Sequence, residues 1–290
     1  MTIANSSRSR KAKAQLFILR VLAYLFIGIL VAMCLFFFVM LLLMSSKSNS
    51  QLQGAFSLKW GGHFLENLHN AWNDASTNIP RGMVNSFIVA MSSALITTYF
   101  SALTAYGIHV YEFRFKRAIF TFIMAIMMIP AQVSAVGFIQ LAYKFGLTNK
   151  LWLLILPGMA APVVFFYMKQ YLESVLPLEM VEAARIDGSS EFRIFNEVVL
   201  PIMKPAVAVQ MIFSFVSSWN NYFMPSLLLT KPEKRTVPIM IAMLRSADYS
   251  KFDMGKVFMF ILLAILPVML VYAVLSKSII KGVTSGSVKG

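Results

Sequence analysis

The segment from Glu182 to Pro201, EAARIDGSSEFRIFNEVVLP, is a polar interruption in an otherwise apolar sequence. Of the 290 residues, 58% are hydrophobic and only 13% are charged. A typical soluble domain is about 25% charged, so this composition indicates a membrane protein. We therefore expect the polar segment to lie outside the hydrocarbon, between apolar segments that cross it.

Apolar runs before and after the polar segment are long enough to cross a bilayer. A transmembrane helix needs about 20 residues for about 30 Å of hydrocarbon and satisfies its own backbone hydrogen bonds there. Hydropathy predicts such helices at residues 16–44, 82–109, 118–143, 151–170, 205–227 and 257–277. The predicted fold class is all-α, a polytopic membrane protein with about six transmembrane helices. Pro157 and Pro162 are expected to make the fourth helix irregular.

The distribution of basic residues predicts the orientation, because cytoplasmic loops are rich in Lys and Arg. Basic residues flank the first span and fill the link between the second and third spans: Arg8, Arg10, Lys11, Lys13, Arg20, Arg114, Lys116 and Arg117. Both termini and the polar segment are therefore expected in the cytoplasm, although the loop between spans five and six is also basic. The net charge of +14 is spread over loops and termini, which favours membrane anchoring over nucleic-acid binding.

This pattern predicts four regions along the chain. They are a basic N-terminus (1–15), a first helix with its outer loop (16–80), a transmembrane core (81–281) containing a polar loop (173–204), and a cytoplasmic tail (282–290). In the outer loop, FLENLHNAW fits a short helix on the membrane surface, with Trp60 and Trp72 as interfacial anchors. A plain solvated connector is the alternative.

The sequence offers no catalytic or metal-binding motif. It contains no GxxxxGK[ST] phosphate loop, and His63, His69 and His109 lack the spacing of metal ligands. The cores of the predicted spans lack the acidic residues, His and Lys that ion-coupled transporters use as relays. We therefore predict no catalytic residue, no metal and no cofactor on this chain, so that any energy must come from a partner.

Two predicted spans carry rows of uncharged polar side chains. In span five such residues recur at helical spacing, and a row of this kind suits the wall of a path for a neutral, hydroxyl-rich solute such as a sugar. The candidate path residues are Gln210, Ser214, Ser217, Asn220, Asn221 and Tyr222. Small polar residues also join helices in lipid, and for span five both interpretations stay open. For the row in span two, Ser93, Thr97, Ser101 and Thr104, helix packing is favoured.

The polar segment predicts two short helices that meet at a glycine. Pro177 can open the first helix, and Gly188 can close it in the left-handed conformation. Ser189 is expected to cap the second helix, with Glu191 in its first turn. Pro201 is expected to end it.

The first of these helices has the profile of a docking element. Met180, Ala183, Ala184 and Asp187 share one face, where the alanines allow close approach of another backbone. Glu182, Arg185 and Asp187 provide charged groups around it. A helix resting on lipid headgroups, or one that binds DNA, is disfavoured because Glu179, Glu182, Asp187 and Glu191 would be repelled by anionic lipid or phosphate.

The residues EAARIDG, followed by VVLPIMKPA, resemble the EAA loop of ABC importer permeases. That loop has the pattern E-A-A, three residues, G, about nine residues, and then a hydrophobic residue before x-L-P. The matching positions are Glu182, Ala183, Ala184, Gly188, Leu200 and Pro201. VNSFIVA, SSWNNYFMP and the ending GVTSGSVKG are similar to the carbohydrate branch, and the ending resembles the smaller membrane subunit of maltose-type oligosaccharide importers. The resemblance covers about residues 80 to 290.

This resemblance implies a type I ABC importer permease fold in the bacterial cytoplasmic membrane. It implies assembly with a second homologous permease subunit, two ATP-binding subunits that hold ATP and Mg, and an extracellular solute-binding protein. The EAA helix would dock in a cleft of an ATP-binding subunit and couple it to the membrane through Glu182, Ala183, Ala184, Arg185, Asp187 and Gly188. The tail from Gly282 to Gly290 would be a second contact or a frayed terminus.

The function expected from this resemblance is that of a permease subunit in an ATP-driven importer of a sugar, expected to be an oligosaccharide. Two alternatives are kept. The chain could be a permease for another solute, such as a polyol or glycerol phosphate. For a phosphorylated solute, we expect cationic side chains in the path. It could also be a membrane scaffold that transports nothing.

Overall fold

The computed structural model describes residues 2–75, 77–246 and 253–286, and these ranges are helical, without a β-strand. The chain forms two compact units. The first comprises Met1–Ala71 with Ser250–Leu262, and the second comprises Trp72–Tyr249 with Leu263–Gly290. One helix, α15 (Met254–Gly286), contributes its first turns to the first unit and the remainder to the second.

The first unit contains α1 (Thr2–Ser45), α2 (Asn49–Gln53) and α3 (Phe64–Trp72). The apolar part of α1, Gln15–Ser45, contains an 18-residue window with a mean hydropathy of 3.1 in which no residue is buried, as expected for a helix surrounded by lipid. The helix begins at Thr2 and continues through residue 15. At the boundary predicted there, the sequence changes from basic to apolar, but the secondary structure does not change. No proline interrupts the basic residues before the apolar run, and the helix continues through both.

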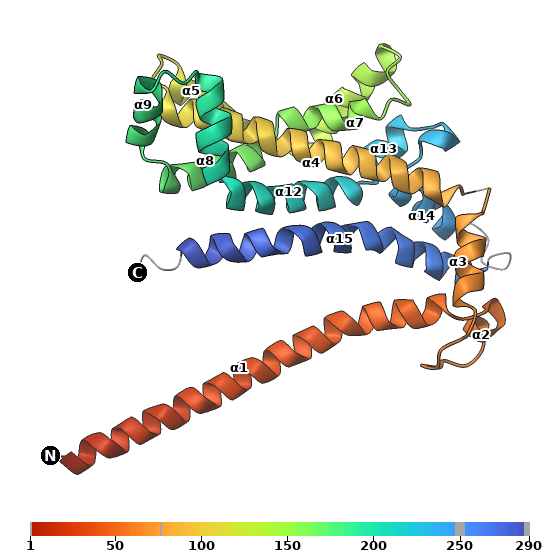
Figure 1. The fold of residues 1–290 in the computed structure, drawn as a ribbon. Coiled ribbons are helices and arrows are strands. Elements are labelled where there is room, and N and C mark those ends of the chain that lie inside the picture. Colours follow the sequence, from red (N-terminus) through yellow and green to blue (C-terminus); the bar gives the residue numbers. More distant parts are fainter. Residues whose placement is uncertain (1, 76, 247–252, 287–290) are drawn as a thin grey trace. The chain divides into compact units, whose positions relative to one another are not determined.

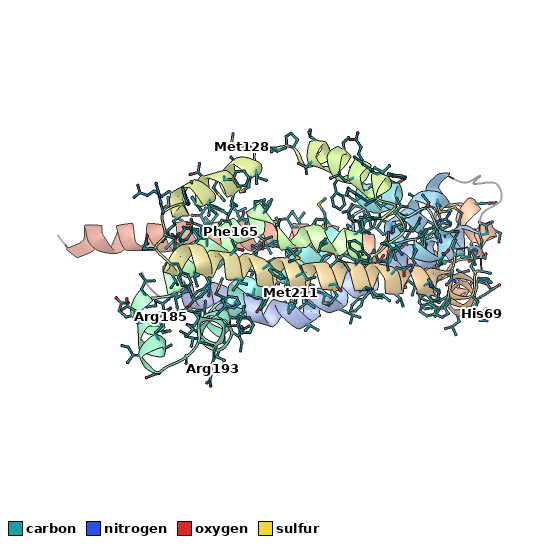
Figure 2. All side chains as sticks on the ribbon, turned by 90° about the horizontal axis from the view of Figure 1, so that it is seen from above. His69, Met128, Phe165, Arg185, Arg193 and Met211 are labelled. Atoms are coloured by element: carbon teal, nitrogen blue, oxygen red, sulfur yellow. The ribbon has the colours of Figure 1, made fainter. Side chains whose placement is uncertain are left out.

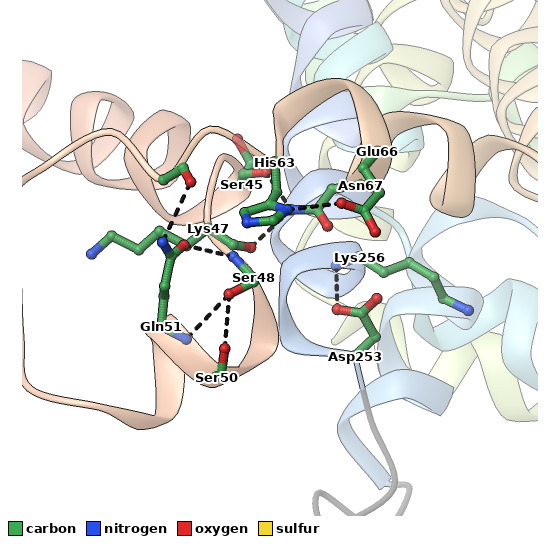
Figure 3. A network of polar contacts seen from close by, with 11 residues as sticks. Ser45, Lys47, Ser48, Ser50, Gln51, His63, Glu66, Asn67, Asp253 and Lys256 are labelled. Atoms are coloured by element: carbon green, nitrogen blue, oxygen red, sulfur yellow. Dashed lines mark hydrogen bonds and ion pairs between the residues drawn. The ribbon is translucent and has the colours of Figure 1, made fainter.

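The segment between α1 and α3 is folded by hydrogen bonds from buried polar side chains (Figure 3). Asn67 Nδ2 donates to the carbonyl oxygens of Ser45 and Lys47, each at 2.9 Å, and Lys47 Nζ donates to the carbonyl oxygen of Ser57. Gly255, at the start of α15, approaches the Lys47 carbonyl so closely that a Cβ would lie 2.6 Å away. The helix predicted from FLENLHNAW is confirmed as α3, whereas its place on a membrane surface stays a prediction.

The second unit is organised around the long helix α4 (Ile79–Val110), which packs against α12 (Lys204–Trp219) and α8 (Pro162–Val175). Figure 1 shows α4 and α12 running side by side, with α9 (Leu178–Ile186) at one end and α13 (Phe223–Leu228) and α14 (Val237–Ser246) toward the other. The remaining elements are α5 (Lys116–Ile126), α6 (Ala131–Lys144), α7 (Trp152–Ile155), η1 (Leu156–Met159), α10 (Glu191–Ile194), η2 (Phe195–Val199), α11 (Leu200–Ile202) and η3 (Pro232–Lys234).

Three of the helical paths are bent. The pair α5 and α6 turns by 93°, the pair α7–η1 and α8 by 40°, and the run from Glu191 to Ile202 turns by 82° into α12. Pro130 stands at the first bend, where Met128 is exposed (Figure 2), and Pro162 begins α8, which confirms the predicted irregularity of span four. By length and composition, the described residues contain three helices able to span a membrane, or up to six if each bent pair is one span. Six is the number predicted from the sequence.

The predicted boundaries of span five are wrong. Span five, predicted at 205–227, breaks after Trp219, and a separate helix, α13, starts at Phe223. Pro225 is in the first turn of α13, where its missing amide hydrogen would have had no partner in the helix. Residues 282–286 of the predicted tail belong to α15, and residues 287–290 lie outside the described ranges. Helix α14 was not predicted.

Candidate functional site

The polar segment contains the predicted turn at its glycine. Gly188 has φ +82°, which confirms the left-handed conformation, and its amide donates to the Arg185 carbonyl at 3.0 Å. The Ser189 amide donates to the Ala184 carbonyl at 3.1 Å, so Ser189 still belongs to the end of α9. Ser190, and not Ser189, therefore stands at the N-cap of α10, without a capping bond from its side chain.

Pro201 does not end the second helix as predicted. Residues Phe195–Val199 form a π-helical turn, in which the amide of Leu200 donates to the Phe195 carbonyl. The wider turn accommodates a residue that has no amide hydrogen, and the helix continues to Ile202. The direction of the chain then changes by 82° at Met203, where α12 begins.

Buried apolar side chains fix the segment to the second unit. Val181 of α9 is fully buried, together with Ile194, Phe195, Val199 and Met203 of the following helices. They share one cluster with residues of α4 and α8, which include Ala102, Tyr106, Phe165, Met168 and Leu172. The orientation of α9 is therefore set by this cluster, and its opposite face points outward.

The outward face of α9 carries most of the predicted docking residues. Glu182, Ala183, Arg185, Asp187 and Gly188 are exposed, and Ala184 is half-buried. Two apolar side chains that sequence reasoning missed stand beside them, because Ile186 is 86% exposed and Phe192 is 69% exposed. Large apolar residues in a polar loop were the signal that could have identified them. This face therefore combines small, acidic and apolar groups.

The guanidinium of Arg185 is exposed but is bound to neighbouring side chains of the protein itself. Its Nε lies 2.6 Å from Glu191 Oε1, and the group lies over the Tyr111 ring, 5.5 Å from the ring centre. The hydrogen bond to Glu191 raises the pKa of Arg185 above its usual range. Burial, followed by hydrogen bonding to Glu191, raises the pKa of Tyr111. Arg185 thus joins α9 to its neighbours, a role that its predicted place on a docking surface did not include.

The rows of uncharged polar residues meet in a cavity of about 720 Å³ between α4, the bent span α7–η1–α8, and α12. Its lining residues are Ser93, Thr97, Leu154, Gly158, Ala161, Val163, Val164, Tyr167, Val209, Gln210, Phe213, Ser214, Ser217, Ser218 and Asn221. No acidic or basic side chain is among them. Ser93 Oγ is buried and has no hydrogen-bond partner among the described residues. The cavity thus presents hydroxyl and amide groups between apolar and aromatic walls.

The cavity contains only part of each predicted row. Gln210, Ser214, Ser217 and Asn221 line it, whereas Asn220 and Tyr222 do not. From span two, Ser93 and Thr97 also line the cavity.

The other half of the span-two row does not line the cavity. Ser101 is buried, whereas Thr104 is exposed and its Oγ1 donates to the Phe100 carbonyl of its own helix at 2.8 Å. The favoured assignment of this row to helix packing therefore suits Ser101 and not Thr104, and for the row it stays a prediction.

Residues 97–284 match the family model of the "Binding-protein-dependent transport system inner membrane component". The arabinooligosaccharides transport system permease protein AraQ of Bacillus subtilis (strain 168) is 35% identical over 209 residues, 71% of this chain and 72% of the relative. The diacetylchitobiose uptake system permease protein NgcG of Streptomyces coelicolor is 33% identical, over 84% of this chain and 80% of its own. The sn-glycerol-3-phosphate transport system permease protein UgpE of Escherichia coli (strain K12) is 30% identical, over 77% and 80%.

A solved structure shares the fold. It is the crystal structure of a bacterial ABC transporter involved in the import of the acidic polysaccharide alginate. One of its chains superposes with a TM-score of 0.76 and 22% identity, over 90% of this chain and 96% of that one.

Proposed function

Because the chain belongs to the family of binding-protein-dependent transport system inner membrane components, we propose that it is the permease subunit of an ATP-driven importer of a neutral oligosaccharide. The observation that carries the substrate class is the cavity beside α4, which has hydrogen-bonding side chains and no charged one. Its volume of about 720 Å³ lies in the range of ordinary small-molecule sites, about 300–1,000 Å³.

The chemistry of the cavity suits sugar hydroxyl groups. Each hydroxyl of a sugar both donates and accepts, and Gln210, Ser214 and Thr97 offer both functions. Tyr167 and Phe213 add aromatic surface for the apolar faces of a sugar ring. A phosphorylated solute, as in the name of the relative UgpE, would call for a cation in the path. A neutral sugar is the better match for this cavity.

Membership of the family supports the following set of partners. The chain forms half of a translocation path with a second homologous permease subunit, and an extracellular solute-binding protein delivers the sugar. Two ATP-binding subunits bind ATP and Mg and hydrolyse the nucleotide, so the permease itself needs no cofactor. Both termini and the segment from Pro177 to Met203 lie on the cytoplasmic side of the bacterial inner membrane, where that segment meets an ATP-binding subunit.

Coupling takes place through α9. Its outward residues Glu182, Ala183, Asp187 and Gly188, together with the half-buried Ala184, contact the ATP-binding subunit, and Arg185 holds the helix in place. Closure of the ATP-binding subunits moves the permease between two states only if their contacts with this helix differ between those states. The cavity is then open to one side of the membrane in each state, and the permease acts as one half of a gate.

Uptake of labelled oligosaccharides tests this proposal. Cells that contain the chain are compared with cells that lack it, across a panel of chain lengths, and with cells that carry Glu182→Lys. We expect loss of uptake of one sugar class in both defective strains, with Glu182→Lys still present in the membrane.

Glu197→Lys is the matched control for this test. It reverses an exposed charge in the same polar segment but outside α9, and it should transport normally. Unchanged uptake without the chain, for every sugar in the panel, would refute the substrate class. Normal uptake by Glu182→Lys would refute coupling through α9.

A further inference from the structure

Glu191 stands where three segments of the second unit meet. Its Oε1 accepts a hydrogen bond from Arg185 Nε of α9 at 2.6 Å, and its Oε2 accepts one from the Tyr106 hydroxyl of α4 at 2.8 Å. Tyr111, just after α4, also interacts with this carboxylate. One acidic side chain at the start of α10 thus joins α9 to α4. Figure 2 shows Arg185 and Arg193 toward one end of α4.

This arrangement differs from an ordinary surface ion pair. Arg193 and Glu197 are four residues apart on one helical path, and each side chain is about 60% exposed, so their pairing holds no two segments together. Glu191 instead uses both oxygens, and one donor comes from Tyr106, which is only 3% exposed. A buried tyrosine hydroxyl requires a partner, and bonds to a charged acceptor are stronger than neutral ones. Loss of the carboxylate would therefore leave Tyr106 unsatisfied.

The apolar cluster holds α9 through Val181 and the half-buried Ala184. Val181 is the only fully buried residue of this helix, and most of its other side chains are exposed. The Arg185–Glu191–Tyr106 contact is therefore a major lateral attachment of α9. A second link, from the Tyr99 hydroxyl to Asn196 Oδ1 at 3.2 Å, attaches α4 to the helix that follows Glu191 and does not involve α9.

The same helix α4 reaches the cavity. It runs from Ile79 to Val110 without a break, so Tyr106 and the cavity residues Thr97 and Ser93 belong to one continuous rod. At about 1.5 Å per residue, Thr97 lies about 14 Å and Ser93 about 20 Å along the axis from Tyr106. A displacement applied at Tyr106 is therefore carried to the cavity wall without an intervening hinge.

We propose that Glu191 is a positioning residue for energy coupling, which ties the docking helix α9 to the cavity-lining helix α4 through Arg185 and Tyr106. This inference rests on the proposed function, in which α9 meets an ATP-binding subunit. When the ATP-binding subunits move α9, the tied Tyr106 moves with it and shifts the wall that carries Thr97 and Ser93. Without this contact, α9 can move with the ATP-binding subunits while α4 keeps its position.

Sugar transport per ATP hydrolysed tests the inference directly. The complete transporter, purified with its partner subunits and placed in lipid vesicles, is compared for Glu191→Gln, Tyr106→Phe and the control Glu197→Gln. Glutamine keeps the shape of Glu191 but removes the charge, and phenylalanine removes only the hydroxyl. We expect Glu191→Gln to lower the ratio at least threefold, Tyr106→Phe to lower it by less, and Glu197→Gln to leave it unchanged, with the ATP-binding subunits copurifying in every case.

Hydrogen exchange of residues 178–187 gives a second measurement that needs no sugar. Glu191→Gln should increase exchange in α9 of the assembled transporter, whereas Glu197→Gln should not. The inference is overturned if Glu191→Gln and Tyr106→Phe keep the normal ratio, if α9 exchange is unchanged, or if transport and hydrolysis fall in proportion as the complex dissociates. Wild-type vesicles that hydrolyse ATP but take up no sugar would count against the proposed substrate, and the exchange measurement would still test Glu191.

Discussion

Gly158 of η1 faces Thr97 of α4 at a separation that leaves no room for a side chain. A Cβ built on Gly158 would lie 2.5 Å from Thr97 Oγ1. Both residues line the cavity, so this close approach brings the bent fourth span against α4 at the cavity wall. The size of residue 158 therefore controls both the helix contact and the position of a hydroxyl that faces the cavity.

We predict that Gly158→Ala lowers sugar uptake and destabilises the purified protein by about 1–3 kcal/mol, the usual cost of overpacking. The methyl group must push Thr97 aside or separate η1 from α4. Gly137→Ala is the control, because a Cβ at that position in α6 meets nothing within 4 Å. Thermal unfolding in detergent and uptake in cells are the two measurements. Equal behaviour of the two variants would show that the contact tolerates a methyl group.

Replacement of Gly188 should impair coupling through backbone strain and not through a clash. Its φ of +82° is unfavourable for alanine, although no atom lies within 4 Å of the added Cβ. We expect Gly188→Ala to reduce uptake and Gly188→Asn to reduce it less, because asparagine adopts this conformation more readily. Both variants should reach the membrane in normal amounts, as measured by immunoblotting. The reverse order of activity would argue against a conformational cause.

Gln210→Leu should weaken sugar recognition in the cavity. Gln210 is 9% exposed and lines the cavity with Ser214, so leucine fills the same space without hydrogen bonds. We expect the sugar concentration at half-maximal uptake to rise about tenfold, which corresponds to about 1.4 kcal/mol. Thr104→Val is the control, since the Thr104 hydroxyl bonds to its own helix away from the cavity. An unchanged half-maximal concentration in Gln210→Leu would remove this residue from the path.

Trp219→Phe should destabilise the second unit without acting on the cavity. Trp219 Nε1 donates to the Ala264 carbonyl at 3.1 Å, and its ring stacks on Phe215 with ring centres 5.7 Å apart. Phenylalanine retains part of the ring packing but loses a hydrogen bond worth about 1 kcal/mol. Thermal unfolding of the purified protein should show a lower midpoint. Trp152→Phe is the control, because Trp152 is 47% exposed, and an equal shift in both variants would contradict the expected role of the hydrogen bond.

The sequence by itself determined the class of protein, the number of candidate spans and the turn at Gly188. Each depends on residues that are close together in the chain. A long apolar run must avoid unsatisfied backbone groups in lipid, which makes it a helix whatever its neighbours are. A glycine after a helical run adopts the left-handed conformation because it has no side chain to prevent it. The break in span five, by contrast, could not be read from the sequence: α12 ends at Trp219, and the exposed residues Asn220 to Tyr222 separate it from α13.

The tertiary structure decided which polar groups act together. Helical spacing placed Ser214 and Thr97 each on one face of a helix, but nothing in either row indicated that both faces border one cavity while Ser101 is buried away from it. Arg185 was expected to point outward, and its contact with Glu191 and Tyr106 joins residues up to 85 positions apart. Periodicity shows that a helix has a polar face, whereas only packing determines what that face meets.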